Sequence, residues 1–117
     1  MCPNNKGMTD TVRKTMLDLH NSYRSSLARG LERDGLGGNA PKAKYMHKMN
    51  YDCEVEASAM KNAKSCVYHH TDWSERVGLG ENIGALSWLN YDKNKAAAEV
   101  SGHLLYFPSS FSVQILM

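Results

Sequence analysis

Residues 8–30 contain the pattern that most limits how this chain can fold. Apolar or weakly polar side chains recur there at spacings of three and four residues, which places them on one face of a single helix. These side chains are Val12, Met16, Leu19, His20, Tyr23 and Leu27. Thr9 or Asp10 can act as the N-cap, and Gly30 can take the left-handed position that ends a helix. A covering element is therefore predicted, because such a face must pack against a sheet or another helix.

A second helix is predicted for residues 52–68, after a loop over residues 31–51 in which glycines and a proline interrupt any periodicity. Asp52 suits the N-cap, acidic side chains follow it, and lysines come near the end, which is the order that the helix dipole favours. One narrow face of this helix carries small side chains: Val55, Ala59, Ala63 and Cys66 or Val67. Such a face permits close packing against a neighbouring element.

Beyond residue 68 the sequence predicts less regular structure. Residues 69–91 read as a loop with one short strand at 82–85, and a third helix is expected over 92–101 with Asp92 as its N-cap. Residues 102–117 carry no charge and many large apolar side chains. Their pattern fits neither an amphipathic helix nor an alternating strand.

Length and charge exclude several classes of protein. A chain of 117 residues is long enough for one small domain. The formal net charge is +2 and the basic residues are scattered singly along the sequence, whereas nucleic-acid-binding proteins gather them on one face. No nucleic-acid partner is therefore expected. No apolar run approaches the roughly 20 residues of a membrane-spanning helix, and residues 1–12 lack the apolar core of a secretory signal peptide.

The stretch "HHTDWSERVGLGENIG" is the main candidate for chemistry. Its two histidines, His69 and His70, precede Glu81 by twelve and eleven residues. A histidine beside a carboxylate can bind a metal or take part in acid–base catalysis. The alternative is a polar loop in which Glu81 accepts hydrogen bonds from backbone N–H groups.

The chain has three cysteines, so at least one has no internal partner. Cys66 precedes His69 and His70, an order that would suit a Cys–His nucleophile pair. Its small-residue helical surroundings favour a structural thiol or a disulfide instead.

Several stretches together resemble one family. "LDLHNSYRSSLARG" resembles the first helix of the CAP superfamily (cysteine-rich secretory proteins, antigen 5 and pathogenesis-related 1), with its HNxxR pattern at His20, Asn21 and Arg24. "HTDWSERVGLGENIG" is similar to the family's His…Gly-Glu-Asn segment, and "YDCEVEASAM" is closest to the nematode activation-associated, or Ancylostoma-secreted, branch. Residues 1–100 are thereby identified as the N-terminal part of a CAP domain, and residues 101–117 as an apolar tail foreign to the family.

The resemblance implies an α+β fold, the family's α-β-α sandwich, reduced here to the N-terminal helices with little of the central antiparallel sheet. The family cleft holds two histidines and two glutamates, which bind a divalent metal such as zinc in some members. His70 and Glu81 match one of each and the other two have no match, so the resemblance implies an incomplete site with His70 as candidate metal ligand and no cofactor of the chain's own. It also makes Cys2, Cys53 and Cys66 disulfide candidates, with Cys2 and Cys53 as the suggested pair and Cys66 left over; the sequence leaves the connectivity open.

Three functions are considered. The first is a secreted, non-enzymatic CAP-type protein of a parasitic nematode, extracellular by resemblance, which binds a host protein, lipid or sterol and modulates host immunity. The second is a truncated gene-model product without a function of its own, because its helices would lack the sheet that covers them. The third is a metal-dependent hydrolase using His70 and Glu81, which is disfavoured because two ligands and no evident nucleophile are too few.

Overall fold

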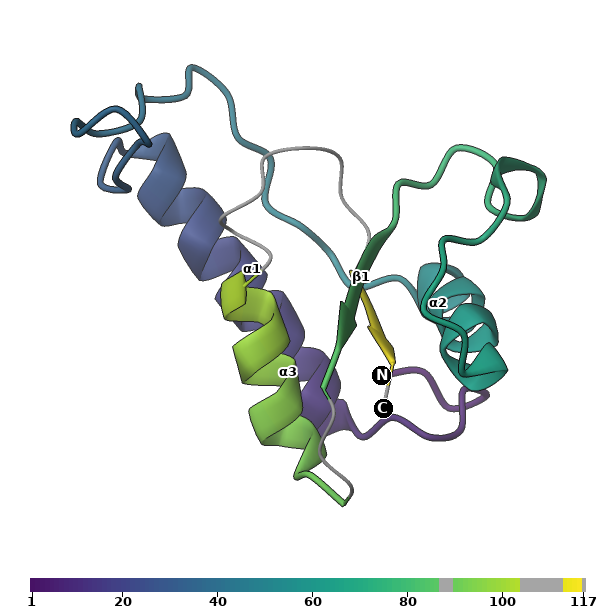
Figure 1. Ribbon diagram of the computed structural model, residues 1–117. Coiled ribbons are helices and arrows are strands. Elements are labelled where there is room, and N and C mark those ends of the chain that lie inside the picture. Colours follow the sequence, from purple (N-terminus) through teal and green to yellow (C-terminus); the bar gives the residue numbers. More distant parts are fainter. Residues whose placement is uncertain (87–89, 104–112, 117) are drawn as a thin grey trace.

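The computed structural model places helices on both sides of a pair of short strands (Figure 1). It describes residues 1–86, 90–103 and 113–116. In chain order, the elements are α1 (Asp10–Ala28), α2 (Cys53–Ser65), the 3-10 turn η1 (Trp73–Glu75), β1 (Asn82–Ala85), α3 (Lys93–His103) and β2 (Val113–Leu116). Helices α1 and α3 pack together on one side of the strands and α2 packs on the other. The result is the predicted α-β-α order with little sheet.

Helix α1 begins and ends where the sequence predicts. Thr9 Oγ1 accepts a hydrogen bond from the backbone N–H of Val12 at 3.2 Å, and Gly30 adopts a left-handed φ of 71° just after the helix. Helix α3 lies beside the N-terminal part of α1 and stops short of its last turns (Figure 1). The predicted apolar face is accordingly buried at Val12 and exposed at Leu27. Among the described residues, no helix combines the length and the hydropathy needed to cross a membrane.

Helix α2 is shorter than predicted. Asp52 is its N-cap, since Oδ1 accepts from the backbone N–H groups of Glu54 at 2.8 Å and Val55 at 3.0 Å. The helix ends at Ser65 because Cys66 adopts a left-handed φ of 56°. The predicted end of this helix at residue 68 was therefore wrong by three residues.

The two strands pair in parallel. The strand predicted at residues 82–85 is confirmed as β1. The prediction that residues 102–117 fit no strand was wrong for Val113–Leu116, which form β2 with Asn82 opposite Val113. The pairing is parallel, unlike the antiparallel sheet expected from the family, since helix α3 crosses between the two strands and returns the chain in the same direction.

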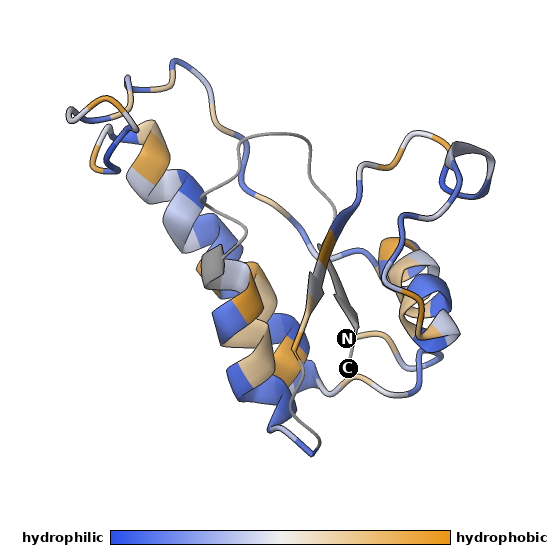
Figure 2. Cartoon of the chain, viewed as in Figure 1, coloured by the Kyte–Doolittle hydropathy of each residue, from blue (hydrophilic) through white to orange (hydrophobic). Residues whose placement is uncertain are grey.

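The core lies where α1, α3 and β1 meet. Val12 and Met16 of α1 pack with Ala97 of α3, and hydrophobic stretches of both helices gather at this contact in Figure 2. Gly84 lets β1 approach closely, because a Cβ there would lie 2.9 Å from Cγ1 of Val100. Small side chains on α3 and a glycine in β1 therefore set the spacing between these layers.

The HNxxR pattern of α1 has a structural role. His20 is buried, and its Nδ1–H donates to the carbonyl oxygen of Met16 at 2.7 Å. The side chain of Asn21 pairs with both backbone groups of Met49, accepting from its N–H at 2.7 Å and donating to its carbonyl at 3.0 Å. Arg24 donates from Nε and Nη2 to the carbonyl oxygen of His47. These bonds hold the loop before α2 along the side of α1.

A disulfide and a buried ion pair fasten the N-terminus to α2. Cys2 and Cys53 are joined by the disulfide. Arg13 donates from Nε and Nη2 to the two carboxylate oxygens of Glu56, each at 2.8 Å, and both side chains are buried. Hydrogen bonding between the pair raises the pKa of Arg13 and lowers the pKa of Glu56, so both remain charged.

Candidate functional site

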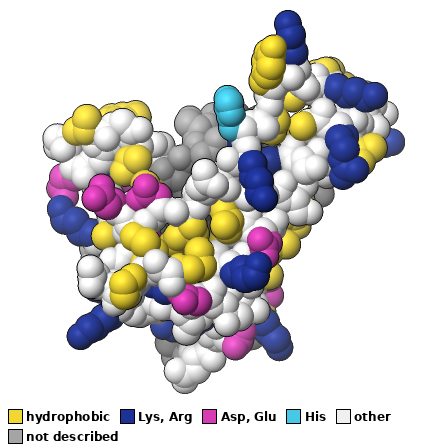
Figure 3. Space-filling view, turned by 180° about the vertical axis from the view of Figure 1, so that it is seen from behind, with side chains coloured by type: hydrophobic (Ala, Val, Ile, Leu, Met, Phe, Trp, Pro, Cys, Tyr) yellow, Lys and Arg dark blue, Asp and Glu magenta, His cyan; other side chains and the backbone are white. Residues whose placement is uncertain are grey.

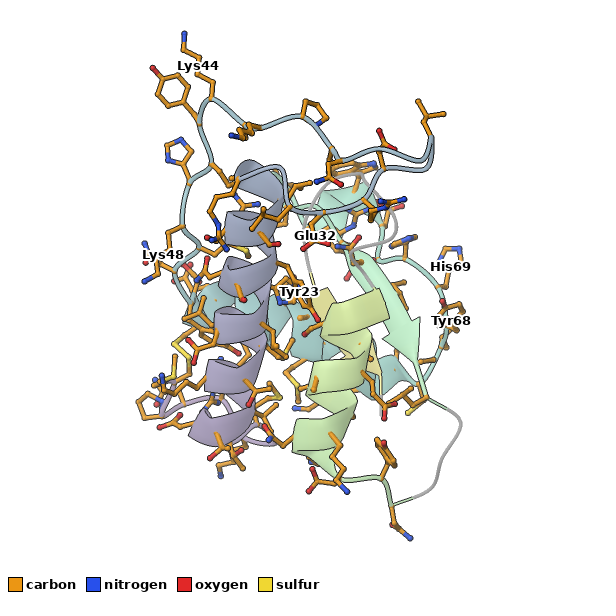
Figure 4. The ribbon with its side chains drawn as sticks, turned by 90° about the vertical axis from the view of Figure 1, so that its left-hand side faces the viewer. Tyr23, Glu32, Lys44, Lys48, Tyr68 and His69 are labelled. Carbon is orange, nitrogen blue, oxygen red and sulfur yellow. A yellow bond between two sulfur atoms is a disulfide. The ribbon has the colours of Figure 1, made fainter. Side chains whose placement is uncertain are left out.

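The loop between α2 and β1 brings His70 and Glu81 together. His70 Nδ1 lies 2.8 Å from Glu81 Oε1. His69 instead turns its Nδ1 to the carbonyl oxygen of His70 at 2.7 Å, and its ring lies on the outer edge of the loop beside Tyr68 (Figure 4). The eleven-residue spacing therefore identifies the histidine that contacts Glu81, and the twelve-residue spacing does not.

The carboxylate of Glu81 is enclosed. Only 2% of its side chain is exposed, and it also accepts hydrogen bonds from the backbone N–H of Thr71 at 2.8 Å and from Asn62 Nδ2 at 3.3 Å. Burial acts to raise the pKa of Glu81, but the hydrogen bonds from Thr71, His70 and Asn62 outweigh it and lower the pKa to about 2. Glu81 is thus ionised throughout the physiological range and is poorly suited to proton transfer there.

Arg76 braces the loop around this carboxylate. Its Nε donates to the carbonyl of Thr71 at 2.9 Å, its Nη1 donates to the carbonyl of Leu79 at 2.8 Å, and its guanidinium stacks on the ring of Trp73 at 4.2 Å. Nε of Arg76 is also 3.9 Å from Glu81 Oε1. The loop is consequently held by contacts with its own backbone, and Glu81 serves as its polar centre.

This arrangement can offer a metal one protein ligand. Glu81 is occupied by its donors and fixes Nδ1 of His70 as the protonated nitrogen, while 57% of the His70 side chain is exposed. A carboxylate in this position orients a ligating histidine from the outer shell. No cluster of three or more His, Cys, Asp or Glu suited to a metal occurs among the described residues, whereas zinc takes at least three protein ligands. The residues described here do not fit a closed zinc site.

Cys66 does not join the histidines. It is exposed, has no disulfide partner in the described structure, and its thiol makes no hydrogen bond with His69 or His70 there. Cys66 occupies the solvent-facing cap of α2 and the two other cysteines pair with each other, so Cys66 is the cysteine left over, and its interpretation as a structural thiol or disulfide stays a prediction. The geometry gives no support to a Cys–His nucleophile pair either.

Sequence reasoning missed an apolar pocket of about 280 Å³ between α1 and α2. Four of its lining residues are methionines: Met8, Met16, Met49 and Met60. Leu17, Val55 and Leu79 add further apolar surface, and hydrophobic side chains are visible on this side of the molecule in Figure 3. We call it the Met-lined pocket. The signal that could have indicated it is the enrichment of methionine, of which the chain has seven.

The buried pair of Arg13 and Glu56 was also missed. Glu56 was expected only to complement the dipole of its helix, and Arg13 only to be one of several scattered basic residues. The one indication in the sequence was that Arg13 follows Val12, a residue of the predicted apolar face of this helix. Because 43 residues separate the partners, no local pattern could have paired them.

Fold and site together define a partial α-β-α domain built around a His–Glu loop, and comparisons place it in a family. The sequence model of the cysteine-rich secretory protein family, CAP, matches residues 17–106. The chain belongs to this family. It is 62% identical over 100 residues to "Ancylostoma secreted protein" of Ancylostoma caninum, a match that covers 86% of this chain.

Two solved structures agree with this assignment. The crystal structure of Na-ASP-1 aligns with a TM-score of 0.85 at 60% identity, over 89% of this chain. The crystal structure of NaASP2 with Zn²⁺ aligns with a TM-score of 0.84 at 52% identity, over 88%. The chain spans 24% of the Ancylostoma secreted protein, 26% of Na-ASP-1 and 54% of NaASP2, so it corresponds to part of each.

Proposed function

We propose that the protein is an extracellular, non-enzymatic binding protein that acts at the interface between a parasitic nematode and its host, and that its Met-lined pocket takes an uncharged lipid. The family assignment and the similarity to a protein named as secreted support the extracellular part. An immunomodulatory role and a host partner follow from the same family expectation. The pocket is the observation that carries the choice of ligand.

Size and lining favour an apolar ligand. Pockets for small ligands usually hold about 300–1,000 Å³ and are mainly apolar. The Met-lined pocket, at about 280 Å³, lies at the lower end of this range and suits one alkyl chain or a small ring system. Methionine side chains are flexible and polarizable, which lets a pocket adapt to apolar ligands of different shape. Four methionines in one lining therefore suit a lipid better than a ligand of fixed polar pattern.

The polar edge of the pocket argues for an uncharged head group. Asp52 and Glu56 contribute carboxylates to the lining. The charge of Glu56 is compensated by its ion pair with Arg13, so Asp52 supplies the negative charge at this edge. Burial lowers the pKa of His20, so the lining holds little positive charge at neutral pH. A fatty acid would bring a carboxylate to this edge, whereas a fatty alcohol or a sterol would bring only a hydroxyl.

The test is displacement of Nile red by dodecan-1-ol. Ala59 lines the pocket and Ala57 is exposed on the same helix, so Ala59→Leu and Ala57→Leu form a matched pair. Dodecan-1-ol should displace the dye from the wild type and from Ala57→Leu, and at least tenfold more weakly from Ala59→Leu. Dodecanoate should compete less well than the alcohol. Equal binding by all three proteins would contradict the pocket assignment.

The other two interpretations are less well supported. A hydrolase would need Glu81 to activate water or hold a metal, but three donors and the surrounding protein enclose its carboxylate. A product without a function of its own would bind no ligand, and the same displacement experiment would then show no dye release in any variant.

A further inference from the structure

The fold gathers basic residues that are scattered in the sequence. Residues 24–48 contain six Lys or Arg and two Asp or Glu, a formal charge of +4, whereas the remainder of the chain carries −2. After α1 ends, the chain turns back and runs along the same helix. The backbone N–H of Ala43 donates to the carbonyl of Ala28 at 3.1 Å, and the bonds of Asn21 and Arg24 hold the segment that follows.

This return brings five exposed cations to one end of the molecule, which we call the basic end: Arg29, Arg33, Lys42, Lys44 and Lys48. Figure 3 shows Lys and Arg side chains clustered on the arm formed by the end of α1 and the loop, where no acidic side chain is visible, whereas acidic and basic side chains are mixed over the rest of that view. In Figure 4, Lys44 and Lys48 both project outward from the returning segment. The expectation of evenly scattered basic residues is therefore wrong for this end.

The two acidic residues of this segment form no ion pair with the five cations, and the segment keeps its formal charge of +4. Asp34 accepts from the backbone N–H groups of Leu36 at 3.0 Å and Gly38 at 2.8 Å, and Glu32 accepts from Ser26 Oγ. Asp34 is thus engaged within the loop, and Glu32 is engaged with the last turns of α1. None of the five cations of the basic end forms an ion pair within the described residues.

Hydrogen bonds to backbone carbonyls and packing contacts position four of these cations without removing their charge. Arg29 Nε donates to the carbonyl of Ser25 at 3.3 Å, and Arg33 Nη2 donates to the carbonyl of Gly37 at 3.4 Å. The stem of Lys42 lies over Gly30, where a Cβ would come within 2.9 Å of its Cγ. Lys44 Nζ lies 5.7 Å from the ring centre of its neighbour Tyr45.

We propose that the basic end binds a sulfated glycosaminoglycan of the heparin type. Uncompensated cations on one exposed end attract a flexible polyanion through long-range electrostatics and release of its counterions. The choice of polyanion rests on the proposed extracellular role. Anionic lipids concentrate in the cytoplasmic leaflet of membranes, so a secreted protein meets sulfated polysaccharides rather than a negatively charged lipid surface.

The test is binding of the full chain to immobilised heparin at about 0.15 M NaCl, the physiological ionic strength. The triple variant K42Q/K44Q/K48Q removes three charges from the basic end. The control K6Q/K64Q/K95Q removes three exposed charges elsewhere and leaves the net charge identical. Affinity should fall at least tenfold in the first variant and less than threefold in the control.

The salt dependence supplies a second readout. The slope of log Kd against log [NaCl] should decrease by about 3 in K42Q/K44Q/K48Q, one for each lysine removed. Unsulfated heparosan should not compete. Equal losses in both triple variants, or no heparin binding by the wild type, would overturn the proposal.

Competition with other polyanions tests whether the basic end prefers a sulfated glycosaminoglycan. Duplex DNA or phosphatidylserine vesicles that compete as well as heparin at the same charge concentration would also overturn the assignment to a glycosaminoglycan. The Ala59→Leu variant should retain full heparin affinity. If heparin binding fails while dodecan-1-ol still displaces Nile red, the basic end is misassigned and the proposed lipid pocket stands; the reverse result would contradict the pocket alone.

Discussion

Replacing Glu81 with glutamine should destabilise the protein substantially at neutral pH. The folded-state pKa of Glu81 is about 2, against an ordinary value of 4.5. Because one pKa unit corresponds to about 1.4 kcal/mol, this difference amounts to about 3 kcal/mol of folding free energy at neutral pH. Glu81→Gln removes the charge but keeps the size of the side chain, and it turns an amide toward the donors from Thr71 and His70.

The sign of the pH dependence follows from the lowered pKa. The contribution of Glu81 is complete above about pH 4.5 and is lost as the pH falls toward about 2, because the folded state then also binds the proton. Urea unfolding followed by far-UV circular dichroism should therefore show wild type and Glu81→Gln separated by about 3 kcal/mol at neutral pH. The two proteins should converge as the pH is lowered through that interval.

A matched control comes from the same loop. Glu75 is exposed and forms an ion pair with Lys61, so Glu75→Gln should change the free energy of unfolding by less than about 1 kcal/mol. A Glu81→Gln protein within about 0.5 kcal/mol of wild type at neutral pH, no larger than an ordinary surface substitution, would refute the reasoning. So would a difference that stays constant down to about pH 2.

Two further predictions concern the attachment of the N-terminus. Arg13→Met should lower the free energy of unfolding, measured with urea, by about 3–5 kcal/mol because it leaves the buried charge of Glu56 unpaired. Arg13→Met/Glu56→Met should recover more than half of that loss. Equal losses in the two proteins would contradict the role given to the ion pair. Cys2→Ser/Cys53→Ser should lower the free energy of unfolding by about 4 kcal/mol, since the disulfide closes a loop with a sequence separation of 51. A melting temperature that does not respond to this double substitution would contradict that estimate.

The helices could be predicted because their determinants are local. Thr9, Asp52 and Asp92 each cap a helix by accepting backbone N–H groups a few residues further on, and such patterns are readable in a single sequence. The end of α2 was misjudged because Cys66, a residue with no preference for left-handed φ, takes that conformation. The error lies at a boundary and not in the identity of the element.

Strand β2 was missed mainly because its stabilisation is not local. Residues Val113–Leu116 gain their hydrogen bonds from β1 across the α3 crossover, and no local pattern identifies that partner. Apolar and polar residues do alternate over 111–115, a short strand signal that was overlooked when residues 102–117 were interpreted as one stretch. The same limit applies to Arg13 and Glu56, whose helices meet only in the fold. Non-local contacts explain each of these omissions.

The candidate site was partly predictable. The resemblance to the CAP family implied that His70 and Glu81 share one cleft, and the structure brings them within hydrogen-bond distance. The enclosure of Glu81 was not predictable, because its donors come from Asn62 on α2 and from the backbone of Thr71. That enclosure changes the interpretation of the pair, since a carboxylate saturated by donors supports the loop and orients His70 instead of reacting.

Methyl NMR of the protein labelled with ¹³C at its methionines would test the central claim most directly. Dodecan-1-ol bound in the Met-lined pocket should shift the methyl signals of the four methionines that line it, with one saturation curve for all four. Met1 and Met46 do not line the pocket and serve as internal controls whose signals should not move. Shifts confined to Met1 and Met46, or no saturable shift in any of the six, would contradict the assignment of this pocket as a lipid site.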